Sequence, residues 1–173
     1  MKVVLYMAIT VNGMIAREDN DTSFTSKEDW ASFRQIAEKI GNLIIGRKTY
    51  ELMEENQLWD KCQYIVVTTN TKLKSTKKNV SFTNKTPKEI LQYLENLNFN
   101  QACVAGGSKL NTSFIKESLI DEIYLAVEPA IISKGISIFT PDDFEYQLEL
   151  LKVKKLSPQT IQLRYKVNND KNR

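Results

Sequence analysis

The feature that most constrains the fold of this sequence is a regular alternation of short apolar runs with longer stretches of helical periodicity. Repeated strand-then-helix order predicts an α/β fold with a mainly parallel sheet, covered by helices on both faces. Sheets of this kind bind ligands at the carboxyl ends of their strands. The strand-like runs are residues 3–9, 43–45, 64–68, 80–82, 102–105 and 123–127.

Helix signals separate these runs. Ser26 is a suitable N-cap for a helix over residues 26–40, and Asp29 three positions later completes an approximate capping box. Thr86 and Pro87 open another helix. Further helices are predicted for residues 47–55 and 108–117, and an antiparallel hairpin for residues 146–154 and 160–167. We therefore expect one domain over residues 1–167 and a polar tail at 168–173.

Composition excludes several classes of function. The chain has 173 residues, of which 42% are hydrophobic, which suffices for a single core. It contains no histidine, so Ser-His-Asp and Cys-His catalysis are excluded. With only Cys62 and Cys103 as thiols, we expect no metal site and two buried free cysteines. No run approaches the ~20 apolar residues of a membrane span, and no signal peptide is recognisable, so we expect a cytoplasmic protein without a membrane partner.

Charge gives little support to nucleic-acid binding. The net charge is +3, and the dense basic run is confined to residues 72–78. This run lacks the aromatic residues on which bases stack, so a solvated loop is the favoured interpretation. Attraction of a phosphorylated ligand is the alternative.

Three predicted strand ends carry residues suited to binding a ligand. Glycine lets a ligand approach the backbone, and the helix that follows offers free N–H groups to an anion. The alternatives are a helix start with surface cations at residues 46–50, a tight turn capped by Ser108 at 106–109, and a plain polar turn at 68–71. The candidate cofactor-binding residues at these ends are Gly46, Arg47, Lys48, Thr49, Thr68, Thr69, Asn70, Gly106, Gly107, Ser108 and Lys109.

The segment after the first predicted strand is also unusual. Asn12 and Gly13 favour a tight turn, and the apolar residues 14–16 follow in what we predict to be a loop. Such a loop could cover a flat ring, or it could be a turn with core contacts.

Taken in order, these motifs resemble the dihydrofolate reductase superfamily, and in particular a stand-alone relative of the riboflavin-pathway pyrimidine reductases. The resemblance covers residues 2–166. It rests on the Asn-Gly-Met-Ile-Ala loop at 12–16, the Gly-Arg-Lys-Thr-Tyr start at 46–50, the Gly-Gly-Ser end at 106–108, and the segments 119–123 and 128–135 with Phe139. It implies a three-layer sandwich, hydride transfer from NADPH, an unusual peptide bond between Gly106 and Gly107, and a homodimer.

The resemblance also implies roles for single residues. Asp29 lies four residues before Phe33, the spacing of the ring-binding acid and the substrate-packing aromatic, although Asp29 could serve only the helix start. We assign catalytic roles to Asp29 and Asn12 and substrate contacts to Phe33 and Glu128. The nicotinamide wall would be formed by Ala8, Gly13 and Ile15, in addition to the strand-end residues above.

The substrate implied is a small heterocycle. Riboflavin-pathway members often carry an acid before the paired glycines and an Asp before the first-loop glycine, whereas this chain has Ala105 and Asn12. We therefore expect a pterin-like or pyrimidine-like ring without naming one. The alternatives are a nucleotide-binding protein without turnover and, less favoured, a nucleic-acid-binding module.

Overall fold

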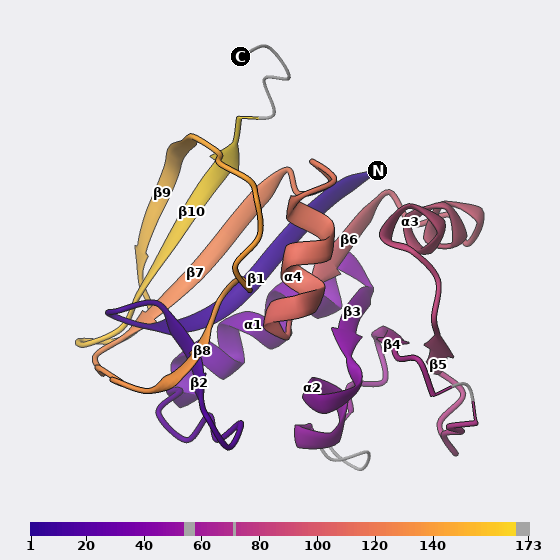
Figure 1. Ribbon diagram of the computed structural model, residues 1–173, viewed down its shortest axis with the longest axis horizontal. Helices are drawn as coiled ribbons and strands as arrows, with labels where there is room; N and C mark the ends of the chain where they lie inside the picture. The colour runs from indigo at the N-terminus through magenta and orange to yellow at the C-terminus, as the bar shows by residue number, and fades with distance from the viewer. Residues whose placement is uncertain (54–57, 71, 169–173) are drawn as a thin grey trace.

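An eight-stranded sheet in the order β5-β4-β3-β6-β1-β7-β10-β9 forms the centre of the computed structural model, which describes residues 1–53, 58–70 and 72–168 (Figure 1). Every neighbouring pair from β5 to β7 is parallel, and β10 and β9 add an antiparallel hairpin at one side. The predicted fold class is confirmed. The strands are β1 (Lys2–Thr10), β3 (Asn42–Gly46), β4 (Gln63–Val67), β5 (Val80–Thr83), β6 (Gln101–Val104), β7 (Glu122–Glu128), β9 (Leu148–Lys155) and β10 (Ile161–Val167).

Helices cover both faces of the sheet, as the resemblance implied. α1 (Lys27–Ile40) lies behind the sheet in Figure 1, and α4 (Ser108–Ile115) lies in front. α3 (Pro87–Asn96) shares the core of α4, and the short α2 (Arg47–Leu52) follows β3. The predicted helix over 47–55 is thus observed only to Leu52, and residues 54–57 lie outside the described part, as do residues 169–173 of the predicted tail. Within the described ranges, no helix combines the length and apolarity needed to cross a bilayer.

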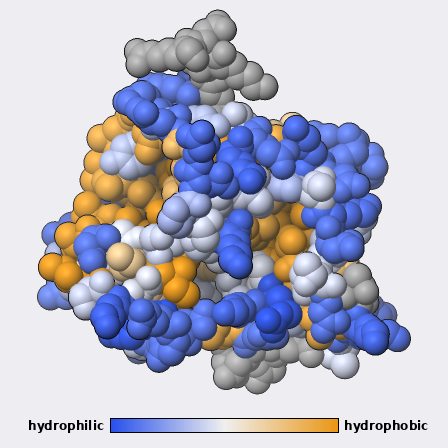
Figure 2. All heavy atoms as spheres, viewed as in Figure 1, coloured by the Kyte–Doolittle hydropathy of each residue, from blue (hydrophilic) through white to orange (hydrophobic). Residues whose placement is uncertain are grey.

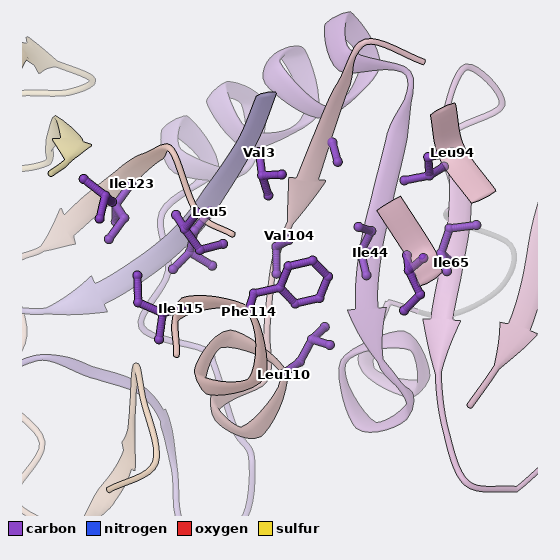
Figure 3. Packing of buried hydrophobic residues seen from close by; sticks show 14 residues of the cluster. Val3, Leu5, Ile44, Ile65, Leu94, Val104, Leu110, Phe114, Ile115 and Ile123 are labelled. Carbon is purple, nitrogen blue, oxygen red and sulfur yellow. The ribbon is translucent and has the colours of Figure 1, made fainter. Parts of the chain in front are cut away.

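Two separate cores hold the layers together, because side chains alternate between the faces of each strand. On the α4 face, Leu110 and Phe114 pack against Val3, Leu5 and Val104 (Figure 3). On the α1 face, a second cluster packs helix residues against the strand side chains that point away from α4. It includes Phe33, Ala37, Tyr6, Leu43, Ile45, Tyr64, Cys62 and Cys103. The two cysteines are buried free thiols, as predicted.

A second, two-stranded sheet corrects the prediction for residues 14–16. β2 (Met14–Arg17) pairs antiparallel with β8 (Gly135–Ser137), so the predicted loop is a strand. Its partner lies more than a hundred residues away in sequence, which local pattern cannot reveal. The strands approach so closely that a Cβ at Gly135 would lie 2.5 Å from the Ala16 carbonyl oxygen.

The hairpin leaves an apolar surface uncovered. Every residue of β9 is exposed, and its register with β10 places Leu148, Leu150 and Val153 opposite Val167, Tyr165 and Leu163 on the α4 face. Leu150 and Val153 are 53% and 55% exposed. Figure 2 shows a hydrophobic area over this part of the molecule.

Candidate functional site

The sheet order brings the chemically marked strand ends into one row. β4, β3, β6, β1 and β7 are neighbours in that order, and their parallel direction puts all five carboxyl ends at the same edge. With about 4.8 Å between strands, the row from β4 to β1 spans about 14 Å. The strand-end residues predicted to bind cofactor therefore lie along one continuous edge.

The glycines of β3 and of the β6–α4 junction meet at the middle of this row. The Gly46 N–H donates to the Gly106 carbonyl oxygen at 2.8 Å, and the Gly106–Gly107 peptide bond is cis, which confirms the unusual peptide implied by the resemblance. Gly106 has a φ of +85°, and a Cβ there would lie 3.3 Å from the Met7 side chain. A Cβ on Gly107 would meet no atom of the described residues nearer than Thr49 Oγ1 at 3.9 Å, so space remains above this peptide.

The start of α4 contains an unsatisfied polar atom. Gly107 is the N-cap and offers no side chain, so the alternative in which Ser108 caps the helix is wrong. The Ser108 side chain is buried, and its Oγ has no hydrogen-bond partner within the described part of the chain. A buried hydroxyl without a partner is costly, and one next to an open glycine peptide fits a ligand group that would complete its hydrogen bonding. Lys109, the next residue, is exposed.

The cationic residues of α2 remain at the surface. Arg47 Nη1 lies 2.5 Å from Glu51 Oε1, an ion pair along the helix, and Lys48 is exposed. Arg47 directly follows Gly46 and Lys48 comes one residue later, and their contact with an anion stays a prediction.

The polar groups of the segment after β4 form hydrogen bonds mainly with one another. The Asn70 N–H donates to Thr68 Oγ1 at 3.1 Å, and Asn70 Oδ1 accepts from the Lys72 N–H at 3.1 Å. Thr69 is exposed, and residue 71 lies outside the described part. These contacts are those of a polar turn, and the adenosine role of residues 68–70 stays a prediction.

Asn12 ties the end of β1 to the chain after β7. Its Oδ1 accepts from Thr10 Oγ1 at 2.8 Å and from the Ile132 N–H at 3.2 Å, and its Nδ2 donates to the Ile132 carbonyl at 2.8 Å. Gly13 allows the turn with a φ of +83°, and Ile15 is buried in β2. The structure thus gives Asn12 a fastening role, while its catalytic role stays a prediction. Ala8, on the central strand, is only half-buried and lies toward the same edge.

Asp29 points into the protein. Its side chain is 3% exposed, and the Tyr6 hydroxyl donates to its Oδ1 at 2.7 Å. Its Oδ2 accepts no hydrogen bond from the residues that the structure describes. Burial, with a smaller contribution from the nearby Glu128 charge, raises the pKa of Asp29 to about 6 against the opposing hydrogen bond from Tyr6.

The capping box predicted for α1 is only half formed. Ser26 Oγ accepts from the Asp29 N–H at 3.1 Å, as expected. The Ser26 N–H, however, donates to Glu128 Oε1 at 2.9 Å instead of to Asp29. Since Glu128 takes the reciprocal contact from another strand, the Asp29 carboxyl is free to face the interior.

Glu128 has both carboxylate oxygens engaged. Oε1 also accepts from Ser26 Oγ at 2.8 Å, and Oε2 accepts from Thr160 Oγ1 at 2.9 Å, so this 1% exposed residue joins α1, β7 and the start of β10. The geometry gives it an anchoring role, and its predicted substrate contact stays a prediction.

Phe33 belongs to an aromatic cluster below the start of α1. Its ring centroid lies 5.0 Å from that of Tyr6, 5.7 Å from Trp30 and 5.2 Å from Trp59. Trp30 is 40% exposed, whereas Phe33 and Trp59 are buried. The cluster could present an aromatic surface to a flat ring through Trp30.

Two residues of the hydrogen-bond network that leads to Asp29, Tyr6 and Gln162, were not singled out from the sequence. Tyr6 is the one hydroxyl-bearing side chain in the apolar run 3–9, and a buried Tyr hydroxyl usually has a partner. Gln162 shares the polar parity of its strand with Arg164 and Lys166, a pattern that favours an exposed face, yet it is fully buried. The sequence therefore contained a signal for Tyr6 but none for Gln162.

A separate hollow of about 510 Å³ lies beside β2, lined by residues 17–19 and 131–134. It contains none of the predicted site residues. We place the candidate site at the strand edge instead, because the open glycine peptide and the unsatisfied Ser108 hydroxyl are both there.

Comparison with known proteins identifies the family of the chain. The sequence model of the RibD C-terminal domain matches residues 1–162. The uncharacterized protein YwjB of Bacillus subtilis (strain 168) is 29% identical over 171 residues, which cover 95% of this chain and 97% of YwjB.

Solved structures show the same fold. A protein of Shewanella sp. PV-4 assigned to riboflavin biosynthesis has a TM-score of 0.81 at 18% identity, covering 98% of this chain and 100% of that one. A diaminohydroxyphosphoribosylaminopyrimidine deaminase/5-amino-6-(5-phosphoribosylamino)uracil reductase of Thermotoga maritima has a TM-score of 0.75 at 15% identity. The match covers 96% of this chain but 56% of the Thermotoga protein.

Proposed function

The chain belongs to the RibD C-terminal domain family of reductase domains, and from this premise we propose that it is an NADPH-dependent reductase of a pterin-like or pyrimidine-like ring. The observation that carries the proposal is the meeting of Gly46, Gly106 and Gly107 beside the buried, unsatisfied Ser108 hydroxyl. A reductase of this kind needs a cofactor cradle at the carboxyl edge of its sheet, and this is the place where the protein leaves space and hydrogen-bonding capacity for one.

The residues along the edge fit a dinucleotide. Free N–H groups at the start of α4 and the Ser108 hydroxyl would contact the pyrophosphate, with Lys109 nearby. Arg47, Lys48 and residues 68–70 would contact the adenosine and its 2′-phosphate, and Ala8 would lie beside the nicotinamide. When bound, NADPH would supply the hydride.

Asp29 is the group on this chain suited to the substrate. A carboxyl with a pKa near 6 is partly protonated at neutral pH, so it can orient a ring nitrogen and share a proton with it. Protonation of a C=N bond makes its carbon a better hydride acceptor. Oδ2 is the oxygen available for this contact, since Oδ1 is bound to Tyr6.

The surrounding residues hold Asp29 in place. Glu128 fixes the start of α1 through Ser26, and the aromatic cluster around Phe33 supports the same turn. Ala105 and Asn12 offer no charge, so we propose that Asp29 is the main polar contact to the ring.

The experiment is a binding and turnover assay. NADPH binding is measured by fluorescence titration of wild type and Ser108→Ala, with Lys116→Ala, at the opposite end of the same helix, as a control outside the edge. Loss of NADPH absorbance is then followed with dihydrofolate and with a ribosylaminopyrimidine. We expect binding weakened in Ser108→Ala alone and turnover with one ring class. Binding without turnover of any heterocycle would favour a nucleotide-binding protein, and no binding would refute the proposal.

We also propose that the protein is a homodimer. The uncovered apolar surface formed by Leu148, Leu150 and Val153 on β9 lies beside an unpaired strand edge of the described sheet, which is a liability in a monomer. A second copy of the chain would cover it.

A further inference from the structure

We infer that Arg164, Gln162 and Tyr6 form a one-way chain of hydrogen bonds that directs the proton of neutral Asp29 to its Oδ2 atom. Arg164 Nε donates to Gln162 Oε1 at 2.7 Å, Gln162 Nε2 donates to the Tyr6 hydroxyl at 3.3 Å, and that hydroxyl donates to Asp29 Oδ1 at 2.7 Å. These hydrogen bonds start at the half-buried Arg164 on β10, pass through Tyr6 on β1 and end at Asp29 on α1. Figure 1 shows how these three elements are arranged.

The direction of each hydrogen bond follows from the first. An Arg guanidinium has only donors and does not lose its proton in a protein, so the Gln162 atom that faces Arg164 must be its oxygen. The Gln162 amide nitrogen must then face Tyr6 and Ser32, and it donates to Ser32 Oγ at 2.9 Å as well. Since the Tyr6 oxygen accepts from Gln162, its own hydrogen is left for Asp29.

Arg164 is itself held in a fixed position. Its guanidinium carbon lies 4.4 Å from the centroid of the Tyr124 ring, a cation–π contact. Tyr124 donates from its hydroxyl to Glu122 Oε2 at 2.8 Å, and Glu122 pairs with Lys2 at 2.6 Å. The register places Tyr6, Tyr124 and Arg164 side by side on β1, β7 and β10.

The consequence for Asp29 is chemical. Oδ1 is held as an acceptor in both protonation states, because the Tyr6 hydroxyl lies 2.7 Å from Oδ1 but 3.4 Å from the Asp29 backbone carbonyl oxygen. A proton on Asp29 is therefore carried by Oδ2, which accepts no hydrogen bond from the described residues. The other charged group that faces Asp29 is Glu128 on β7, and its oxygens are occupied by Ser26 and Thr160.

The role in catalysis rests on the proposed function, in which Oδ2 faces the substrate ring. Tyr6, Gln162 and Arg164 are then positioning residues: they touch neither substrate nor cofactor but decide which oxygen presents the proton.

The test is an NMR titration of Asp29 in protein labelled with carbon-13 at the Asp carboxyl groups. Tyr6→Phe removes the donor to Oδ1 and keeps the ring packing, so the pKa of Asp29 should rise by about one unit. Arg164→Met should raise the pKa of Asp29 by less, because it removes the charge that polarises the hydrogen bonds but keeps the bond from Tyr6 to Asp29. Arg34→Met, which removes an exposed Arg from α1, should leave the pKa unchanged.

The outcomes separate this inference from the proposed function. If the Asp29 pKa is the same in wild type, Tyr6→Phe and Arg164→Met, the proposed chain of hydrogen bonds is refuted, whether or not the protein is a reductase. If the Asp29 pKa rises as expected but the pH profile of kcat does not shift with it, the result supports the chain of hydrogen bonds and refutes the role of Asp29 in turnover. Arg164 is half-buried at one side of the sheet, so Arg164→Met keeps the test decisive if Tyr6→Phe does not fold.

Discussion

Replacing Asp29 with asparagine should stabilise the fold at neutral pH and remove most of the activity. Burial raises the pKa of Asp29 from 3.8 to about 6. Each pKa unit corresponds to about 1.36 kcal/mol, so keeping this carboxyl ionised in the folded protein costs about 3 kcal/mol. A neutral amide at this position carries no such cost, and its oxygen can still accept from the Tyr6 hydroxyl.

The sign of the pH dependence follows from proton binding. Between about pH 4 and pH 6 the folded protein holds a proton on Asp29 that the unfolded chain has lost. The free energy of unfolding contributed by this group is therefore highest below pH 4 and falls as the pH rises to about 6. Asp29→Asn lacks this slope, so the variant and wild type should be equally stable near pH 4. Above pH 7 the variant should be more stable by about 3 kcal/mol, or about 6–12 °C in Tm.

The assay is urea unfolding of both proteins at several pH values between 4 and 8. Glu28→Gln is the matched control, because it removes an exposed carboxylate from the same first turn of α1 and reports any helix-dipole contribution. An Asp29→Asn protein that is less stable than wild type at pH 7.5, after this correction, would refute the view that Asp29 is a desolvated carboxyl. Turnover of the same variant should fall about 100-fold under the proposed function.

Three further outcomes are expected. Gly107→Ala should remove most of the Tm rise caused by NADPH, because its Cβ would fill the space above the Gly106–Gly107 peptide; a full Tm rise would show that no ligand lies there. Arg47→Ala should weaken NADPH binding at least about tenfold and leave NADH binding nearly unchanged in fluorescence titrations, and equal losses for both would argue against a 2′-phosphate contact. The double variant Leu150→Arg/Val153→Arg should have the mass of a monomer in light scattering, where wild type has the mass of a dimer. The control Lys152→Glu, on the opposite face of β9, should remain dimeric. A wild-type monomer at micromolar concentration would disprove the dimer.

The strand order along the chain and most strand ends could be predicted from the sequence, because these depend on local patterns. The apolar run at 3–9 and the glycines at 46 and 106–107 are such patterns, and the structure brings them to one edge. The strand at 14–17 was missed because its partner lies at 135–137, and pairing at that separation depends on the whole fold.

The environment of Asp29 was beyond local inference for a similar reason. The pattern Ser26-x-x-Asp29 predicted a reciprocal capping box, and the structure shows Glu128 in the reciprocal position. Once Glu128 binds the Ser26 N–H, Asp29 turns inward to Tyr6. Contacts among three distant segments, the start of α1, β7 and β1, decide this outcome, and a pattern within one helix does not contain that information.

The central position of β1 has a consequence for synthesis of the protein. β1 pairs with β6 and β7, whose residues follow it by about ninety positions or more. At about 5–20 residues per second, translation leaves this apolar strand without either neighbour for about 5–20 s. The nascent chain therefore exposes an apolar strand with two unpaired edges throughout that interval. Ribosome-associated chaperones of the host should contact residues 2–10 before any other strand of the sheet.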